Sequence, residues 1–439
     1  MSNWLHNQAL VIPPEYERIA QDCRKEKIMK KTIALLFALL LISSFAWAAE
    51  PVTIEFIQWW APELPAGSFR AIMDQFEAQN PGIKVNLVSG PYSSTRDQIV
   101  TGAATGTLSD VVGLDGAWVN DLAKQGAISP LDGLMASTQF DASQVAAIIK
   151  LNGKSYMFPV ASFVYPVFIN LDLMNAAGIQ KMPATRTEFL QAARKLTNAS
   201  KNQYGWVLPL SLQTPNGVQN DVMSWVWASG KSMLKSGKPD LTNADVISAL
   251  KFIQGMYKEG LISPGSFAKQ EQDKVEEFVN GRVGMMVDTL AHINMIRQRN
   301  PNLKFAISAL PAVDGYNGRR GLPYAAWGIG ISQNSTHKDE AWKLVSYLMS
   351  PTVNGKLVSI AHAFPGNVNA KPDFVVTDEL FGKGFQIFQS GVLANEFVGL
   401  PVAEELMRQF DEEIQLMLDG KQTAEQAAAK AQAKWSKSF

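Results

Sequence analysis

Carboxylates and tryptophans occur together just after two predicted strands. Trp59 and Trp60 end one strand, and Glu63 follows them. Asp115 ends another strand, and Trp118 lies on the first turn of the next helix. Carboxylates accept strong charge-assisted hydrogen bonds from hydroxyl groups, and indole faces pack against patches of C–H groups, so this combination suits a sugar. Two plainer explanations stay open, because Asp115 could only cap the helix and Trp118 could pack in the core.

Pairs of aromatic residues give further candidates for a binding cleft. Adjacent residues of a strand point to opposite faces, so one of Trp59 and Trp60 is expected to face the cleft. Trp225 and Trp227 lie two positions apart on a predicted helix, roughly 200° around its axis, so one of them is expected to leave the packed face. The other candidate ligand contacts are Tyr92 and Ser93 after the second strand, Tyr165 in an extended apolar segment, Asp288 at a strand-to-helix junction, where it could also be a helix cap, and Trp327 beside Gly328.

The sequence lacks the common motifs of metal sites, cofactor sites and catalytic nucleophiles. The histidines after residue 48 are not in His-Glu-x-x-His spacing, and the one cysteine is Cys23, so a zinc site has no ligand set. A Gly-x-Ser-x-Gly elbow and a phosphate-binding glycine loop are also missing. We therefore predict no metal, no cofactor and no catalytic residue. A secreted glycan-cleaving enzyme that uses two carboxylates, such as Glu63 and Asp115, stays open as the alternative from another class.

The composition is that of a globular protein without an excess of either charge. Hydrophobic residues make up 46% and charged residues 18%, and 40 Lys and Arg balance 40 Asp and Glu. Nothing in this balance attracts nucleic acid or an acidic membrane surface. About 390 residues follow the predicted leader, which is more than one hydrophobic core usually organises, so two domains are expected.

The segment 29–48 has the layout of a secretory signal peptide. Two lysines precede an apolar run over 33–45, which ends in the small-residue site Ala46-Trp47-Ala48. The run has about 13 residues, whereas a membrane-spanning helix needs roughly 20. We expect a cleaved leader and a soluble periplasmic protein without a lipid anchor, because Cys23 lies upstream of the leader. Residues 1–28 are either a mis-set translation start or a long charged extension of the leader.

Alternating strand and helix patterns near the start of the chain predict a parallel sheet. Strands are expected over 53–60, 84–88 and 110–114, with helices after Ser68 and over 95–105 between them. This β-α-β-α-β order gives a mostly parallel sheet with helices on both faces. Ligands of open α/β sheets bind beyond the carboxyl ends of the strands, which is where the tryptophans and carboxylates named above lie.

Three segments have the character of crossings between two lobes. The segments 159–170 and 305–313 are extended, apolar and interrupted by prolines, and a third break follows at Ser350-Pro351. Each lobe is then built from non-contiguous pieces. The expected N-terminal lobe combines 49–162 with 311–349, and the expected C-terminal lobe combines 163–310 with 350–439.

Several motifs in a fixed order carry a resemblance to a known family. They are Phe76-Glu77-Ala78-Gln79-Asn80-Pro81-Gly82, the stretch 102–115, Asn152-Gly153-Lys154-Ser155-Tyr156, the stretch 278–285, Trp327-Gly328-Ile329-Gly330, and Ala341-Trp342-Lys343. Over 53–436 the sequence resembles the extracellular solute-binding proteins of family 1, the carbohydrate-binding components of ATP-driven importers. The resemblance implies a two-lobed α/β periplasmic binding protein fold (type II, Venus flytrap), with the ligand held between the lobes, hinge closure and no catalysis.

The same resemblance implies two partners, a carbohydrate ligand and the membrane permease of an ABC transporter with its cytoplasmic ATPase. No nucleic acid partner is expected, and the protein is expected to be a monomer. The same fold could instead bind a non-sugar solute. Glycerol phosphate would need an arginine or a helix N-terminus in the cleft, and a polyamine would need several acids there. The bias toward aromatic residues favours a sugar over both.

Overall fold

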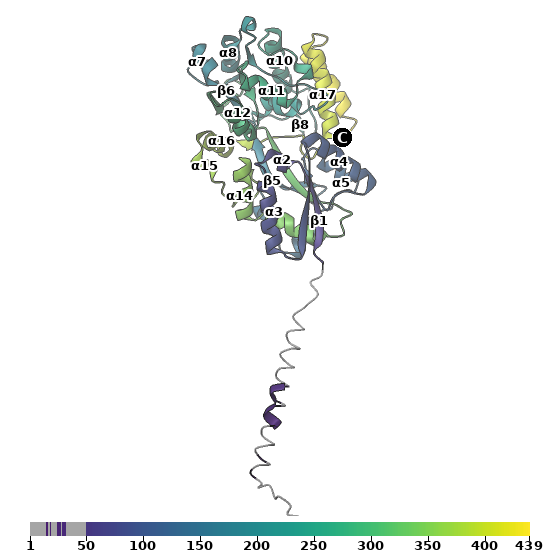
Figure 1. The fold of residues 1–439 in the computed structure, drawn as a ribbon. Helices are drawn as coiled ribbons and strands as arrows, with labels where there is room; N and C mark the ends of the chain where they lie inside the picture. The colour runs from purple at the N-terminus through teal and green to yellow at the C-terminus, as the bar shows by residue number, and fades with distance from the viewer. Residues whose placement is uncertain (1–14, 16–17, 19–23, 28, 32–49) are drawn as a thin grey trace, which may run out of the picture. The chain divides into compact units, whose positions relative to one another are not determined.

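The computed structural model describes residues 15, 18, 24–27, 29–31 and 50–439. The chain forms two units, Met1–Pro51 and Val52–Phe439. In the first unit, helical residues include Glu26 and Lys30, whose side chains form an ion pair at 2.8 Å. The predicted signal-peptide cleavage site lies outside the described residues. The second unit contains every strand of the described chain (Figure 1).

The larger sheet has seven strands and begins with the predicted alternation of strands and helices. The first three strands, β1 (Val52–Gln58), β2 (Ile83–Ser89) and β3 (Val111–Leu114), pair in parallel, as predicted. β13 (Tyr324–Ile331) runs antiparallel between β3 and β5 (Lys154–Val164). β14 (Phe364–Pro365) and β4 (Ile149–Leu151) both pair with β5.

Helices with a buried apolar face cover the larger sheet. α3 (Ser68–Gln79) buries Phe69, Ile72, Met73 and Phe76, at the spacing expected of an amphipathic helix. α14 (Pro351–Ala361) packs beside α3 and against β5. The other helices of this part of the chain are α2 (Trp60–Glu63), α4 (Tyr92–Thr105), α5 (Val119–Lys124), α6 (Asp132–Ser137) and α13 (Lys338–Leu348).

The first strand ends two residues earlier than the sequence predicts. β1 stops at Gln58, and Trp60 begins the short helix α2. The side-chain Oε1 of Gln58 accepts a hydrogen bond from the backbone N–H of Ala61 at 2.8 Å, which stabilises the turn into this helix. Trp59 and Trp60 therefore diverge at a strand-to-helix turn and not across a pleated strand.

The smaller sheet has four strands in the order β11-β6-β10-β7. β10 (Val283–Val287) is fully buried, runs parallel to β7 (Tyr204–Trp206) and antiparallel to β6 (Val167–Asn170). β11 (Phe305–Ser308) pairs with the other edge of β6. The helices beside this sheet are α7 (Leu171–Ala176), α8 (Arg186–Leu196), α9 (Ser224–Trp227), α10 (Ala244–Lys258), α11 (Glu271–Val279) and α12 (Ile293–Arg299), with a π-helical turn, η3, at Val218–Val222.

The chain passes between the two sheets at the segments that the sequence predicts as crossings. β5 of the larger sheet is followed directly by β6 of the smaller one, and β11 leads back toward β13. The third crossing is expected at residue 350. The chain remains with the larger sheet beyond this residue, because β14 still pairs with β5. The lobe boundaries by residue number stay a prediction.

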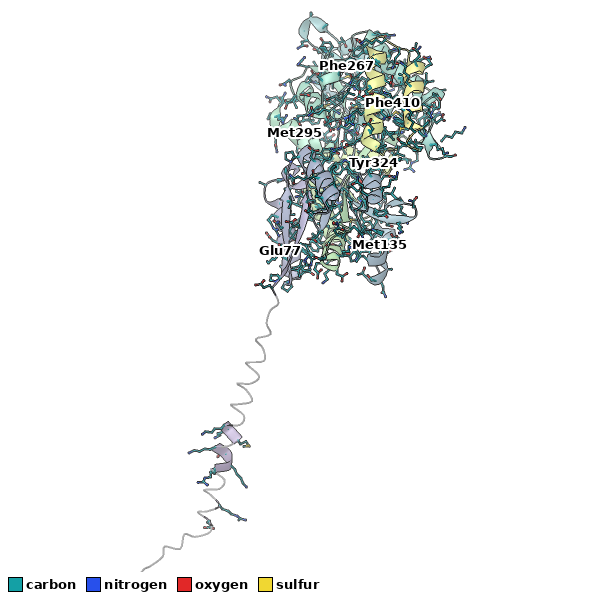
Figure 2. All side chains as sticks on the ribbon, turned by 90° about the vertical axis from the view of Figure 1, so that its right-hand side faces the viewer. Glu77, Met135, Phe267, Met295, Tyr324 and Phe410 are labelled. Carbon is teal, nitrogen blue, oxygen red and sulfur yellow. The ribbon has the colours of Figure 1, made fainter. Side chains whose placement is uncertain are left out.

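The C-terminal helices pack mainly beside the smaller sheet. α16 (Glu379–Ser390) contacts β11, and α17 (Ala403–Leu418) and α18 (Ala424–Trp435) contact α10. Figure 2 shows Phe410 of α17 and Glu77 of α3 far apart within this unit, with Tyr324 of β13 and Met295 of α12 between them.

Among the residues that the structure describes, none of the helices has the length and apolar character needed to cross a bilayer. The remaining elements are α15 (Phe374–Thr377) and the short pairs β8 (Leu234–Lys235) with β9 (Lys238–Pro239) and β12 (Gly321–Leu322) with β15 (Val392–Leu393).

Candidate functional site

A cavity of about 510 Å³ lies where elements of the two sheets meet, and we call it the aromatic cavity. Its larger-sheet wall consists of Trp59, Pro62, Glu63, Tyr92, Asp115, Phe163, Tyr165, Ala325, Ala326 and Trp327. Its smaller-sheet wall consists of Asn216, Gln219, Asn220, Glu271, Gln272, Thr289, Ala291, His292 and Met295. Six of the predicted ligand contacts are therefore brought together, all from segments that follow or belong to strands of the larger sheet: Trp59, Glu63, Tyr92, Asp115, Tyr165 and Trp327.

Two tryptophans of the larger-sheet wall are held by other aromatic rings. Trp327 stacks on Trp60, with ring centroids 5.4 Å apart and an interplanar angle of 10°. Trp60 itself is fully buried behind the wall, so Trp59 is the member of the adjacent pair that lines the cavity. The ring of Trp59 lies 5.3 Å from that of Tyr92, which fixes both rings at the cavity surface.

Trp118 supports the larger-sheet wall without lining the cavity. Its ring lies 5.4 Å from Trp59 and 5.2 Å from Tyr92. The indole Nε1 donates a hydrogen bond to Glu404 Oε1 at 3.0 Å. The packing interpretation of Trp118 therefore describes this structure. Ser93, the neighbour of Tyr92, lies in α4, but its side chain is outside the described part of the chain.

Asp115 serves both as a local cap and as a lining carboxylate. One carboxylate oxygen accepts a hydrogen bond from the backbone N–H of Ala117 at 2.9 Å, and the other accepts one from the Tyr92 hydroxyl at 3.3 Å. Burial is the main cause that raises the pKa of this carboxyl group to about 6. Both sequence interpretations of Asp115 are thus compatible with its position.

Glu63 is the second carboxylate of the larger-sheet wall. It ends α2, and the residue keeps an exposed surface although protein groups of both walls lie around its carboxyl group. The desolvation this causes raises its pKa to about 7, the nearby charge of Glu271 raises it further, and His292 and the Trp327 indole oppose the shift. Glu63 can therefore hold or release a proton near neutral pH.

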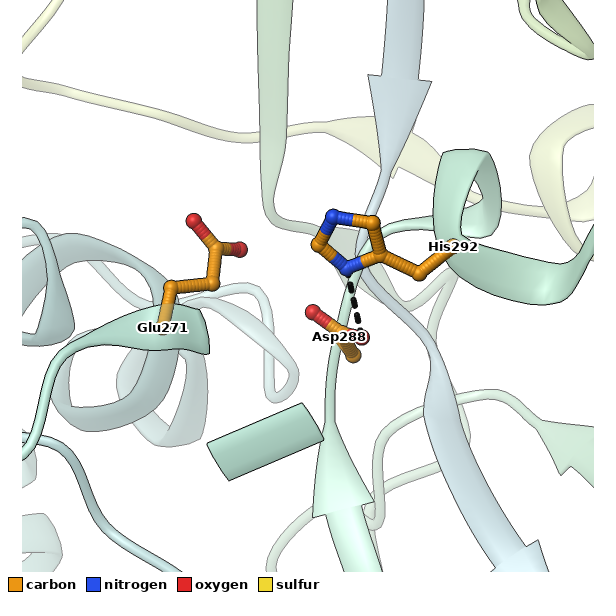
Figure 3. A group of neighbouring side chains, drawn as sticks. All are labelled: Glu271, Asp288 and His292. Carbon is orange, nitrogen blue, oxygen red and sulfur yellow. Dashed lines mark hydrogen bonds and ion pairs between the residues drawn. The ribbon is translucent and has the colours of Figure 1, made fainter. Parts of the chain in front are cut away.

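The smaller-sheet wall is backed by a buried network of charged groups (Figure 3). Asp288 accepts a hydrogen bond from, or shares a proton with, His292 Nδ1 across 2.9 Å. The ammonium group of Lys274 is fully buried, 3.3 Å from Asp221 and 3.7 Å from Asp288. Burial disfavours the charged forms, but the opposite charges outweigh it, so the pKa of Asp288 is lowered and that of His292 is raised.

Asp288 does not line the cavity, contrary to the prediction. Its side chain is fully buried and turns toward His292 and Lys274, because a carboxylate at the end of the buried strand β10 needs charged partners. The next residue, Thr289, lines the cavity in its place, and its hydroxyl accepts a hydrogen bond from the backbone N–H of Ala291 at 3.3 Å.

Glu271, Asp288 and His292 also offer possible metal-ligand atoms that lie within 4.8 Å of one another. The sequence predicts no metal site, because the histidines after residue 48 lack His-Glu-x-x-His spacing and the one cysteine is Cys23. Lys274 already supplies a positive charge to Asp288, and His292 Nδ1 is engaged with the same carboxylate. The ion pairs account for this arrangement, so the geometry by itself does not indicate a metal ion.

Trp225 and Trp227 both lie away from the cavity, so the expectation that one of them reaches it is wrong. Trp225 is fully buried among Phe189, Trp206 and Phe252. Trp227 is also buried, and its Nε1 donates to Glu396 at 2.7 Å. The helix α9 has only four residues and is covered on both sides, so its two faces both belong to the core.

A second cavity of about 560 Å³, the charged cavity, adjoins the aromatic one and shares Tyr92, Asp115, Asn216, Gln219, Glu271, Gln272 and His292 with it. Its own basic residues are already engaged. Arg96 forms an ion pair with Glu404, and Arg408 lies 2.8 Å from Glu405. The charged cavity therefore extends the site with paired charges.

The polar residues of the smaller-sheet wall are not predicted from the sequence. Asn216 and Gln219 belong to a loop and the π-helical turn η3, which have no regular apolar pattern. Glu271 lies in the first turn of α11, where acidic residues are common for helix stability alone. His292 is one of the histidines that lack the spacing of a zinc motif, and no sequence signal places it in the cleft.

The family comparison agrees with this architecture. The model of the bacterial extracellular solute-binding protein family matches residues 61–355. A putative binding protein of Brucella abortus (strain 2308) is 30% identical over 317 residues, which cover 71% of this chain and 75% of the relative. A galactooligosaccharide-binding protein of Bacillus subtilis (strain 168) is 22% identical over 298 residues, 66% of this chain and 67% of the relative. The chain belongs to the bacterial extracellular solute-binding protein family.

Solved structures share the fold. An ABC transporter solute-binding protein from Thermotoga lettingae, bound with α-D-tagatose, has a TM-score of 0.74 and 22% identity, covering 89% of this chain and 99% of that one. An ABC substrate-binding protein from Listeria monocytogenes, in complex with cycloalternan, has a TM-score of 0.74 and 21% identity, covering 88% and 98%. The predicted family and the predicted two-lobed α/β fold are confirmed.

Proposed function

We propose that the chain binds a sugar or oligosaccharide in the aromatic cavity and delivers it, chemically unchanged, to the permease of an ABC importer. The observation that carries this proposal is the composition of the cavity. Five aromatic residues, Trp59, Tyr92, Phe163, Tyr165 and Trp327, line it together with carboxylates of both walls and amides of the smaller-sheet wall. Aromatic rings pack against the C–H faces of a sugar, and the polar groups bond to its hydroxyls.

The size of the cavity fits this ligand class. Its volume of about 510 Å³ lies within the roughly 300–1,000 Å³ of typical small-molecule sites. The adjoining charged cavity gives room for additional sugar units beside Asn216 and Gln219. The proteins of similar fold include ones solved with α-D-tagatose and with cycloalternan, which supports a carbohydrate here as well.

Glycerol phosphate is a weaker candidate for the ligand. A phosphate group needs an arginine or a helix N-terminus committed to it. The arginines of the charged cavity, Arg96 and Arg408, are engaged with Glu404 and Glu405. The aromatic cavity, as described by its lining residues, has carboxylates where a phosphate would need positive charge.

Release of the intact ligand distinguishes this proposal from glycan cleavage. Glu63 and Asp115 line the same cavity, and both have raised pKa values, so an acid and base pair deserves a direct test. We expect oligosaccharides incubated with the protein to be recovered unchanged by chromatography. Appearance of shorter products that depends on Glu63 would contradict transport.

Hinge closure on the ligand is the proposed mechanism of capture. The walls come from two sheets joined by the crossings after β5 and after β11, so rotation at these segments would bring the walls together. We propose that the exported protein acts as a monomer, after cleavage of the leader and without a lipid anchor. Small-angle scattering should show compaction on ligand addition, and mass spectrometry of the exported protein should give Ala49 as its first residue.

A calorimetric screen across neutral and amino sugars, from mono- to tetrasaccharides, tests the function itself. At least one sugar should bind with a stoichiometry of one. Absence of binding by every sugar, combined with binding of spermidine or glycerol phosphate, would assign the fold to another solute.

A further inference from the structure

The aromatic cavity has more acids than bases. Three carboxylates, Glu63, Asp115 and Glu271, are among the described residues that line it, whereas His292 is the only basic side chain among them. A neutral sugar would leave this excess of negative charge in a partly desolvated site, which is energetically unfavourable. The imbalance therefore bears on the chemistry of the ligand.

The positive charges behind the smaller-sheet wall do not remove this excess. Lys274 lies between Asp221 and Asp288, and His292 is paired with Asp288. These two cations already face two buried carboxylates before Glu271 is counted. The Oε1 atom of Glu271 is buried and has no hydrogen-bond partner among the described residues. Its other oxygen, Oε2, accepts a hydrogen bond from Asn216 Nδ2 at 3.3 Å, so one oxygen of Glu271 is available to a ligand.

The pKa values of the three lining carboxyl groups agree with a missing cation. Burial raises the pKa of Glu63 to about 7 and that of Asp115 to about 6, and it also raises the pKa of Glu271. An opposite charge nearby would lower these values, as Lys274 and His292 do for Asp288. Lys274 and His292 also act on Glu271, and His292 acts on Glu63, but burial still outweighs these charges, as it does for Asp221, whose pKa is raised to about 7.

Glu63 and Glu271 also lie on opposite walls. Glu63 ends α2 beside the larger sheet, and Glu271 begins α11 beside the smaller one. They are close enough for the charge of Glu271 to raise the pKa of Glu63. A cation between them would relieve this repulsion and connect the two walls. The rings of Trp59 and Trp327 line the same cavity and favour a cation near their faces.

We propose that the solute is a sugar that bears a protonated amine, and that Glu63 and Glu271 hold the ammonium group between the two walls. This inference rests on the proposed function and narrows its ligand class. The aromatic rings and the amides of Asn216 and Gln219 suit the ring and hydroxyls of a sugar, which a linear polyamine lacks.

Matched sugars test the proposal by calorimetry at pH 7, where the amine of such a sugar is still largely protonated and Glu63 and Asp115 are at least partly ionised. The probes are glucosamine, galactosamine and β-1,4-linked glucosamine oligomers of two to four units, each compared with its N-acetylated and its neutral hydroxyl counterpart. The amine form should bind about tenfold or more tightly, because an ammonium adds charge-assisted hydrogen bonds to two carboxylates.

The outcomes separate this inference from the proposed function. Equal or tighter binding of the acetylated or neutral sugars overturns the amine proposal and leaves the sugar-binding function standing. Binding of spermidine without binding of any sugar overturns both, as does a lack of binding by every sugar in the screen.

Variants locate the ammonium group. Glu63→Gln and Glu271→Gln keep the side-chain size and remove the charge, so each should reduce the preference for the amine form by about tenfold and change the affinity for the acetylated form much less. Glu379→Gln is the matched control, because Glu379 is exposed on α16 and does not line the cavity. Thermal unfolding checks that each variant is folded. Glu63 is more exposed than Glu271, so Glu63→Gln is the variant expected to fold. An unchanged preference for the amine form in Glu63→Gln would refute the placement even if Glu271→Gln fails to fold.

Discussion

The two walls of the aromatic cavity are built on different physical principles. In the larger-sheet wall, Trp327 rests on Trp60 and Trp59 rests on Trp118, so the lining rings are positioned by other buried rings. In the smaller-sheet wall, His292 and Glu271 are positioned beside buried ion pairs of Lys274. Apolar packing is insensitive to pH and salt, whereas a charged network depends on every partner. The comparison indicates that the larger-sheet wall supplies the aromatic contact area, together with Glu63 and Asp115, whereas the smaller-sheet wall is organised by buried charges.

Removal of the buried cation should have the largest effect, and only on the smaller-sheet wall. Lys274→Met leaves Asp221 and Asp288 buried without their shared partner, so the free energy of unfolding should fall by about 3–5 kcal/mol in chemical denaturation. Lys84→Met, which removes a more exposed ion pair with Glu77, is the control and should change stability little. Similar stability of both variants would show that the network does not hold this wall.

Truncation of a lining ring tests the larger-sheet wall. Trp59→Ala removes an aromatic face from the cavity and should weaken binding of the best sugar about thirtyfold or more, measured by calorimetry on folded protein. Tyr257→Ala is a suitable control. Tyr257 belongs to α10, stacks on Phe267 and lines neither cavity. If both variants retain affinity, the rings of this wall do not supply the contact area.

The pH dependence of binding distinguishes charge from contact area. Glu63 has a pKa of about 7, raised mainly by burial, so it is mostly protonated at pH 6 and mostly ionised at pH 8. An amine sugar should therefore bind several-fold more weakly at pH 6 than at pH 7, and this difference should shrink in Glu63→Gln; at still higher pH binding should weaken again because the sugar amine loses its proton. The N-acetylated sugar serves as the control ligand. Tighter binding of the amine at pH 6 than at pH 7 would exclude an ionised Glu63 as its partner.

The smallest expected effect concerns the hydrogen bond between Tyr92 and Asp115 within the larger-sheet wall. Tyr92→Phe keeps the ring and removes a hydroxyl that donates to Asp115 at 3.3 Å, so sugar affinity should fall by about threefold. Tyr347→Phe removes a comparable hydroxyl, bonded to the Ile72 carbonyl at 3.4 Å, from a region that lines neither cavity. An equal effect of both changes would point to stability and not to the site.

The fold of the larger sheet follows closely from sequence patterns. The apolar spacing of Phe69, Ile72 and Phe76 predicts α3, and the alternation of such helices with apolar strands predicts the parallel pairing of β1, β2 and β3. These patterns are local and repeat along the chain. The exact end of β1 was missed because a side-chain bond from Gln58, which no periodic pattern encodes, starts the next helix.

The candidate site was predicted only in part, and mainly for the larger-sheet wall. Trp59 and Trp327 could be chosen because they lie in or beside strands, whose carboxyl ends meet at one edge of a sheet. Trp225 and Trp227 misled the prediction, since helical spacing shows that two side chains diverge but not that both directions are buried. Glu271 escaped notice because an acid in a first helical turn also has a purely local explanation.

The parallel stacking of Trp60 and Trp327 has a practical consequence for spectroscopy. The ring centroids of the two indoles lie 5.4 Å apart, and the ring planes are nearly parallel. Trp60 is buried in the core, and Trp327 lines the cavity. Such closely spaced chromophores couple their excited states, so we expect a band from this pair in the circular dichroism of the protein. A solute that covers Trp327 perturbs that band, and the protein thereby carries its own optical reporter of occupancy.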